Sequence, residues 1–146
     1  MDPLKISSPA FRSGEFIPGK FTCQGQDVNP PIQIEGIPQE TKSLALIVDD
    51  PDAPGGTWVH WVVWNIPMIE SISENSVPGE EGWNDFRRTG WGGPCPPSGA
   101  HRYFFKVFAL DTTLKLPTTT TKRQLEDAMK GHVLAKGELI GKYKKL

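Results

Sequence analysis

The sequence predicts a mainly β fold in a single domain, and three observations support this prediction. The chain has 146 residues, the usual size of one domain and enough to bury a core, so we treat residues 1–146 as one unit. Its 15 Gly and 14 Pro exceed average usage, and turn residues recur at short intervals near the N-terminus. Short apolar runs lie between such turns, and a single segment has a helical pattern. Many turns between short strands are typical of an all-β domain.

Four short segments have the composition of β-strands. The clearest, residues 43–48, is almost continuously apolar, contains β-branched residues and stops at Asp49, Asp50 and Pro51. This pattern is typical of a buried strand that ends in a turn. The predicted strands, in chain order, are residues 32–34, 43–48, 58–66 and 103–110.

One helix is predicted near the C-terminus. Thr121 and Gln124 have the spacing of a capping box, in which each side chain bonds the backbone of the other residue. The residues that follow form an apolar face at helical spacing, made of Leu125, Ala128, Met129, His132 and Val133. Gly137 is expected to end the helix, and residues 138–143 are expected to return as a last strand.

The formal net charge of −1 argues against nucleic-acid binding, because nucleic-acid-binding domains carry a basic surface that neutralises phosphates. No apolar run approaches the roughly 18 residues that span a bilayer, and the N-terminus lacks a basic region followed by an apolar core. These features predict a cytoplasmic protein without integral membrane association.

The chain has two cysteines, Cys23 and Cys95, which lie far apart in the sequence and form no C-x-x-C pair. This spacing leaves open whether the two side chains meet in the fold. Because the cytosol is a reducing compartment, we expect two thiols and no disulfide.

Ionisable side chains lie beside the apolar faces of three predicted strands. Side chains alternate between the two faces of a strand, so Asp50 shares a face with Leu44, Leu46 and Val48. By the same rule, two histidines and a tyrosine share faces with apolar residues of their own strands: His60 with Trp58, Val62 and Trp64, and His101 and Tyr103 with Phe105 and Val107. Burying polar groups without partners is costly, so we expect these four side chains to lie together around something polar.

Two stiff loops flank these strands. The turn Asp50-Pro51-Asp52-Ala53-Pro54 contains two prolines, which fix the backbone and hold the carboxylates still. Residues 92–99 combine rigid Pro with Gly, and free N–H groups in this loop can form an anion nest. The loop ends the long connection between residues 66 and 103. Connections of this length without secondary structure are usually functional or mobile.

Three short motifs together resemble a known family. They are Asp50-Pro51-Asp52-Ala53-Pro54, Trp58-Val59-His60-Trp61, and Gly93-Pro94 with Gly99-Ala100-His101-Arg102-Tyr103. In this order and spacing they resemble the phosphatidylethanolamine-binding proteins, which include the Raf kinase inhibitor proteins. Residues 131–135 and 137–143 resemble the bacterial and archaeal branch, so the similarity covers nearly the whole chain. The resemblance implies a β-sandwich with Greek-key connections and one or two short helices.

The resemblance also implies a pocket for phosphate, phosphorylated lipid head groups or similar oxyanions. The positions that match the family motifs assign its lining to Asp50, His60, Gly93, Pro94, His101 and Tyr103, with Asp52 and Pro54 shaping the rim. Asp50 is expected to accept a hydrogen bond from an imidazole or from a ligand's ammonium or hydroxyl group. Arg102 alternates away from the side chains on either side of it, so we do not expect it to clamp an anion there.

The sequence therefore predicts a non-enzymatic protein that binds a phosphate-like anion or a phosphorylated small molecule, without a cofactor. One alternative is an inhibitor or regulator of a kinase or protease that acts through the pocket rim. A second is a small hydrolase that uses His60 and His101. A metal site built from Asp50, Asp52, His60 and His101 lacks H-x-H or H-E-x-x-H spacing, and Ser98 lacks the G-x-S-x-G elbow of hydrolases. By analogy with related prokaryotic proteins we expect a homodimer.

Overall fold

The computed structural model describes residues 2–146, which form two antiparallel β-sheets and one α-helix. The mainly β fold predicted from the sequence is confirmed. In chain order the elements are β1 (Lys5–Ser7), the 3-10 helix η1 (Gly19–Phe21), β2 (Ile32–Glu35), β3 (Ser43–Asp50), β4 (Trp58–Ile66), β5 (Ser71–Ile72), β6 (Glu80–Glu81), β7 (His101–Leu110), α1 (Lys122–Met129) and β8 (Val133–Tyr143). Within this described part of the chain, no helix has the length and apolar character that crossing a membrane requires.

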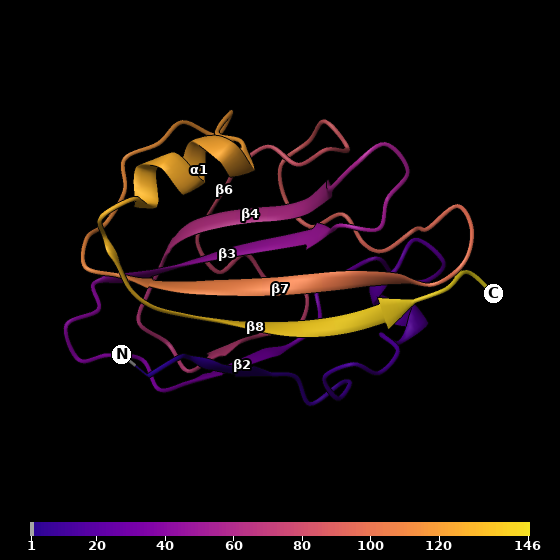
Figure 1. The fold of residues 1–146 in the computed structure, drawn as a ribbon, viewed down its shortest axis with the longest axis horizontal. Coiled ribbons are helices and arrows are strands. Elements are labelled where there is room, and N and C mark those ends of the chain that lie inside the picture. The colour runs from indigo at the N-terminus through magenta and orange to yellow at the C-terminus, as the bar shows by residue number, and fades with distance from the viewer. Residues whose placement is uncertain (1) are drawn as a thin grey trace.

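The five-stranded sheet, of order β6-β4-β3-β7-β8, positions the candidate site. Its central strand β3 pairs with β4 on one side and with β7 on the other. Every residue of β3 is buried, because the smaller sheet covers one face of the strand and α1 covers the other (Figure 1). The chain leaves β4 and returns on the far side of β3 as β7, a non-sequential order typical of Greek-key connections.

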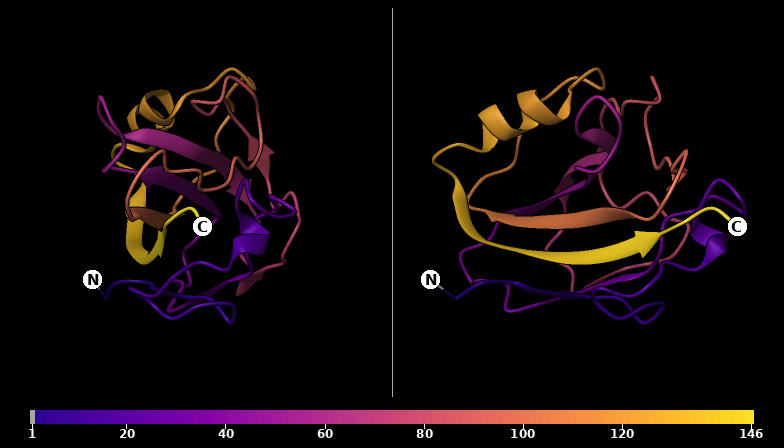
Figure 2. Two further views of the ribbon diagram at one scale, coloured as in Figure 1. Left: turned by 90° about the vertical axis from the view of Figure 1, so that its right-hand side faces the viewer. Right: turned by 45° about the vertical axis from the view of Figure 1, so that its right-hand side comes forward.

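The three-stranded sheet, of order β1-β2-β5, closes the inner face of the larger sheet. Its Ile34 is fully buried in the same apolar cluster as Leu46 of β3. On the outer face, Leu125 and Met129 of α1 pack in a second cluster with Ile47. Figure 2 shows α1 outside the five-stranded sheet, on the side away from the N-terminal segment. Alternate residues of β3 thus belong to two separate cores.

The predicted start of α1 is confirmed, and its predicted end is wrong. The Thr121 hydroxyl accepts the N–H of Gln124, and the Gln124 side chain accepts the N–H of Thr121, which completes the capping box. The helix ends at Met129 because Gly131 takes a left-handed conformation, with a φ of 81°, and turns the chain into β8. Gly137, the predicted stop, lies inside β8.

A β-bulge in β4 changes the side-chain alternation predicted for this strand. The adjacent β3 residues Val48 and Asp49 pair with Trp61 and Val59, so β4 has one extra residue, His60, at this point. His60 and Trp61 therefore both face inward. The expectation that His60 shares a face with Val62 and Trp64 is wrong, because these two residues pack beneath α1.

Candidate functional site

The ends of β3, β4 and β7 surround a cavity of about 250 Å³. Four side chains that the sequence predicts to lie together line it: Asp50 at the end of β3, His60 at the bulge of β4, and His101 and Tyr103 at the start of β7. All four residues are buried. The other lining residues are Ala53, Pro54, Trp58, Phe86, Cys95, Pro96 and Pro97, so the described lining contains no Lys or Arg.

His101 and Asp50 form a buried pair across two adjacent strands. His101 Nδ1 lies 2.6 Å from Asp50 Oδ2, and because a carboxylate oxygen accepts hydrogen bonds, Nδ1 carries the proton. The other oxygen, Oδ1, accepts the backbone N–H of Asp52 at 2.7 Å. Asp50 thus accepts a hydrogen bond from an imidazole, and the ring atom of His101 left for a ligand is Nε2.

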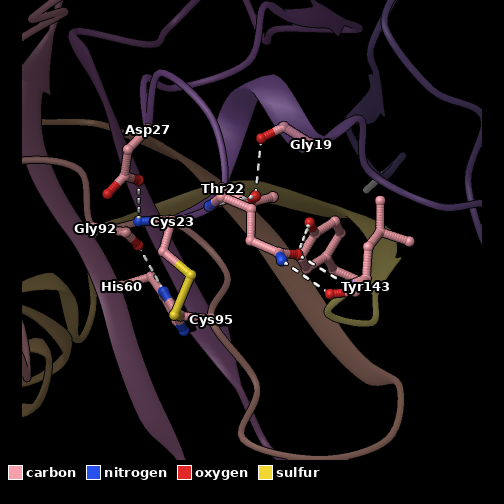
Figure 3. Close-up of a disulfide and its surroundings, with 11 residues drawn as sticks. Gly19, Thr22, Cys23, Asp27, His60, Gly92, Cys95 and Tyr143 are labelled. Carbon is pink, nitrogen blue, oxygen red and sulfur yellow. Dashed lines mark hydrogen bonds between the residues drawn. A yellow bond between two sulfur atoms is a disulfide. The ribbon is translucent and has the colours of Figure 1, made fainter.

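His60 is oriented by the loop that begins at Gly92. Its Nδ1 donates to the Gly92 carbonyl oxygen at 2.6 Å (Figure 3). The Gly92 N–H donates in turn to the His60 carbonyl oxygen at 3.0 Å. Burial lowers the pKa of His60 below its ordinary value of 6.5, although the hydrogen bond to Gly92 acts in the opposite direction. Nε2 is again the ring atom left for a ligand, and it accepts hydrogen bonds when the ring is neutral.

Tyr103 contributes a buried hydroxyl beside the Asp50 carboxylate. The residue is 1% exposed, and its ring packs edge-on against His60 with 5.2 Å between the ring centroids. Its Oη has no hydrogen bond of ordinary length among the described residues, and the Asp50 carboxylate is the polar group that lies beside it. Burial raises the pKa of this phenol well above its usual range, so the hydroxyl keeps its proton and can donate it.

Asp52 holds the rim turn onto the start of β7 and does not line the cavity. Its carboxylate accepts three hydrogen bonds from Arg102, one from the backbone N–H and two from the guanidinium, each at 2.9 Å. The guanidinium hydrogen bonds are the main reason why the pKa of Asp52 is lowered to about 2. Pro54, on the same turn, does line the cavity. Arg102 is engaged outside the cavity, in agreement with the expectation that it does not clamp a ligand there.

Gly93 and Pro94 are not among the residues that line the cavity. The Gly93 N–H donates to Asp27 Oδ1 at 2.8 Å, and the Pro94 carbonyl oxygen accepts the N–H of Cys23 at 3.2 Å. The Gly93 N–H is therefore not free for the predicted anion nest, and Pro94 has no N–H. A Cβ at Gly93 would lie 2.4 Å from the Phe21 carbonyl oxygen, so glycine permits the close approach of two segments.

Cys23 and Cys95 form a disulfide, so the expectation of two thiols is wrong. The turn after η1 carries Cys23 and packs against the loop that carries Cys95, which brings the two Cα atoms to 5.5 Å (Figure 3). Cys95 also lines the cavity. The sequence could not indicate this bond, because it joins two loops that no local spacing relates.

Phe86 and Trp58 form an aromatic wall that the sequence analysis missed. Their rings pack edge-on with 5.5 Å between centroids, and Phe86 also packs edge-on against His60 at 5.3 Å. Phe86 belongs to the long connection between β4 and β7, where its N–H donates to Asn84 Oδ1 at 2.9 Å. The length of this connection is the one sequence signal that points to it.

Two imidazole atoms in the cavity have no partner among the described residues, Nε2 of His60 and Nε2 of His101. Each can donate or accept a hydrogen bond according to its protonation, and the surrounding wall is largely aromatic or proline. Over residues 2–146 the structure has no cluster of three or more His, Cys, Asp or Glu side chains arranged to hold a metal ion. The cavity is suited to a small polar ligand.

Sequence comparisons with known proteins identify the family. The family model described as phosphatidylethanolamine-binding protein matches residues 7–144. A UPF0098 protein of Pyrococcus abyssi is 53% identical to this chain, and the alignment covers 97% of this chain and 85% of the relative. A UPF0098 protein of Methanothermobacter thermautotrophicus is 45% identical, with 97% of this chain and 99% of the relative covered.

Two solved structures have the same fold. A phosphatidylethanolamine-binding protein homologue from Chlamydia trachomatis has a TM-score of 0.95 and 39% identity, with 100% of both chains covered. YbcL from E. coli, described as a new member of the mammalian family, has a TM-score of 0.91 and 29% identity, with 99% of this chain and 100% of that chain covered. The family model, the relatives and the fold agree, and the chain belongs to the phosphatidylethanolamine-binding protein family.

Proposed function

We propose that the protein binds a small phosphate-like oxyanion, free or as part of a phosphorylated head group, in the cavity between His60 and His101. The observation that carries this proposal is that His60 and His101 both line the cavity with Nδ1 engaged, so that two Nε2 atoms are left for a ligand beside Tyr103. Hydrogen phosphate accepts hydrogen bonds through its oxygens and donates one through its hydroxyl, so it suits a small cavity that holds imidazole and phenol groups. The volume of about 250 Å³ lies below the roughly 300–1,000 Å³ of pockets for drug-sized ligands, which favours a small group.

Anion binding in this cavity requires protons on the ligand or on the histidines. Nδ1 of His60 donates to Gly92, and Nδ1 of His101 donates to Asp50, so a neutral ring presents only an acceptor at Nε2. An acceptor repels the lone pairs of a fully deprotonated anion. Such an anion therefore binds together with a proton taken up by the site. A hydrogen phosphate meets the same need by donating its own hydroxyl proton to Nε2.

Sulfate affinity is expected to increase as the pH falls from about 8 to about 5.5, by at most roughly tenfold per pH unit for each proton taken up. Sulfate has no proton to lose in this range, so the change reports on the protein. Because burial lowers the pKa of His60 from 6.5, the protonated ring that sulfate requires becomes more populated as the pH falls. Calorimetric titration at several pH values measures the affinity and the proton uptake. An affinity that does not depend on pH would contradict this site.

The matched controls for this experiment are His60→Gln and His132→Gln. His132 lies outside the cavity, with its Nδ1 2.8 Å from Asp111 Oδ1, so its replacement should leave the pH dependence of sulfate binding unchanged. Replacement of His60 should reduce that dependence.

Without ligand, neutral His60 contributes stability that is fully present above its unfolded pKa of 6.5 and is lost as the pH falls from there towards the lower folded pKa.

Tyr103→Phe is expected to separate ligand binding from stability. In the free protein this substitution removes a buried hydroxyl that has no hydrogen bond of ordinary length, so the free energy of unfolding should stay the same or rise by about 1 kcal/mol. Phosphate affinity should fall roughly tenfold, because a hydrogen bond to a charged ligand is lost. Denaturant unfolding measures the stability, and calorimetry measures the affinity. Comparing inorganic phosphate with phosphoethanolamine in the calorimeter distinguishes a free anion from a head group.

Tyr143→Phe is the matched control for Tyr103→Phe. The Tyr143 hydroxyl donates to Gln24, and neither residue lines the cavity. This variant should lose about 1 kcal/mol of stability and keep its phosphate affinity. If Tyr103→Phe instead lowers stability and leaves binding intact, the hydroxyl has a structural role and the proposed contact is wrong.

We further propose that the protein does not transform its ligand. Hydrolysis through a covalent intermediate requires a side-chain nucleophile beside a general base. Ser98 is exposed and is not among the lining residues, while Asp50 already accepts hydrogen bonds from His101 and from the backbone of Asp52. These contacts support a binding role. Release of phosphate from a phosphate monoester by the purified protein, abolished in His101→Ala, would overturn it.

A further inference from the structure

The segment of residues 95–100 has one covalent cross-link to the rest of the protein, at Cys95. No hydrogen bond joins these six positions to any other residue of the described chain. Before the segment, the Pro94 carbonyl oxygen accepts the N–H of Cys23, and after it the Arg102 N–H donates to the rim turn. The disulfide is therefore the one cross-link that acts directly on this segment.

The same segment forms part of the cavity wall. Cys95, Pro96 and Pro97 line the cavity together with His60 and His101. Figure 3 shows Cys95 and the disulfide next to the His60 ring. Consecutive prolines stiffen the backbone of this wall, so it moves as a unit if its attachment is released. A cross-link at its first residue fixes the position of the wall.

The other half of the disulfide lies at the protein surface. Cys23 is exposed in the turn after η1, whereas Cys95 is half-buried. Reduction begins with attack of a thiolate on an accessible sulfur, and exposed disulfides are reduced more readily than buried structural ones. A reductant can thus approach Cys23 from the solvent without entering the cavity.

We propose that the Cys23–Cys95 disulfide is a redox switch for the cavity. The oxidised protein holds the wall in place and binds its ligand tightly, and reduction releases the wall and weakens binding. For its effect on affinity, this inference rests on the proposed anion-binding function. The reductant is a dithiol, which supplies two electrons and two protons.

The exchange reaction proceeds in two steps. One thiolate of the dithiol attacks the Cys23 sulfur, the bond between the two cysteines breaks, and Cys95 leaves as a thiolate that takes up a proton. The second thiol of the reductant then attacks the mixed disulfide, releases Cys23 as a thiol and closes the oxidised dithiol. The protein gains two thiols, and the reductant becomes a disulfide.

Reduction leaves the surrounding framework in place. Trp91 Nε1 donates to the Phe21 carbonyl oxygen at 3.2 Å, and the Gly93 N–H donates to Asp27 at 2.8 Å. These hydrogen bonds join the two loops without the help of the sulfur atoms. The effect of reduction is therefore confined to residues 95–100 and to the cavity that they border.

The switch is tested by measuring affinity and wall order on the oxidised protein and on the protein reduced with dithiothreitol. Calorimetry with sodium sulfate is expected to give a Kd about tenfold larger for the reduced form. This value applies when the wall takes its binding position in about a tenth of the reduced molecules, because the apparent Kd is the intrinsic Kd divided by that fraction. The NMR order parameters of the Ser98, Gly99 and Ala100 amides are expected to fall on reduction, and those of β3 and β7 are expected to stay unchanged. Unchanged affinity overturns the proposal.

Cys23→Ser is the matched variant, because it breaks the cross-link and leaves Cys95 in the wall. Without reductant it should bind sulfate as weakly as the reduced wild-type protein, and dithiothreitol should have no further effect on it. Slow hydrogen exchange in β3 shows that the variant is folded. A folded Cys23→Ser variant that binds sulfate as tightly as the oxidised wild-type protein overturns the switch.

The two measurements distinguish failure of the switch from failure of the proposed function. If the oxidised and reduced proteins bind sulfate equally tightly, the switch is wrong and the anion site stands. If neither form binds sulfate, phosphate or phosphoethanolamine, the proposed anion site is wrong, and so is the proposal that the disulfide controls anion affinity. The order parameters of residues 98–100 then decide alone whether the disulfide holds the wall.

Discussion

Replacing both Cys23 and Cys95 by serine is expected to lower the free energy of unfolding by about 4 kcal/mol. The disulfide joins residues 72 positions apart, so it restricts a large part of the unfolded chain. Cross-links that close longer loops remove more conformational entropy from the unfolded state. Denaturant unfolding of the oxidised wild-type protein and of the double variant measures the difference.

The reduced wild-type protein is the matched comparison for the double variant. It keeps both cysteines and lacks the cross-link, so the two proteins should unfold within about 1 kcal/mol of each other. Dithiothreitol should lower the stability of the wild-type protein and leave the double variant unchanged. A loss of less than about 1 kcal/mol in the double variant would contradict the prediction, because it would mean that the bond barely restricts the unfolded chain.

Gly93→Ala is expected to lower the free energy of unfolding by about 3 kcal/mol and to displace the cavity loop. The new Cβ would lie 2.3 Å from Asp27 Oδ1, 2.4 Å from the Phe21 carbonyl oxygen and 3.0 Å from Thr22 Cα. Two of these neighbours are backbone atoms, so a side-chain rotation cannot relieve the overlap. The loop must move away from the turn after η1, which also weakens the hydrogen bond from the Gly93 N–H.

Gly99→Ala is the matched control in the same loop. A Cβ at Gly99 has no atom within 4 Å, but its φ of 68° is left-handed, so the variant should lose only about 1 kcal/mol through backbone strain. Denaturant unfolding measures the stability of both variants, and the exchange of Gly92 and Gly93 amides follows the loop. A milder effect for Gly93→Ala than for Gly99→Ala would show that the two segments do not pack as closely as described.

The strands and the start of the helix follow from local sequence patterns. Residues 43–48 are recognisable because β3 is buried on both faces, and the capping box at Thr121 specifies where α1 begins. The end of α1 does not follow in this way. Gly131 and Gly137 are both suitable stops, and the choice depends on the pairing of β8 with β7, which is a contact between distant segments.

The candidate site was predictable where strand alternation is regular. Asp50 and Tyr103 reach the cavity because β3 and β7 alternate without interruption at these positions. His60 reaches it through a bulge, which depends on pairing with β3 and has no signature in neighbouring residues. Phe86 and the disulfide depend on how loops pack against each other. Such contacts depend on the whole fold, so they cannot be predicted from a pattern of adjacent residues.

The bulge in β4 makes the cavity sensitive to insertions and deletions. Without the extra residue, regular pairing would place His60 opposite Asp49, whose carboxylate lies beneath α1 with Lys122 Nζ 2.7 Å away. A one-residue change in the length of β4 would therefore turn the imidazole out of the cavity even if every residue of the site were kept. Among relatives that retain the site, length variation is expected in loops such as residues 54–57, and this strand should keep its length.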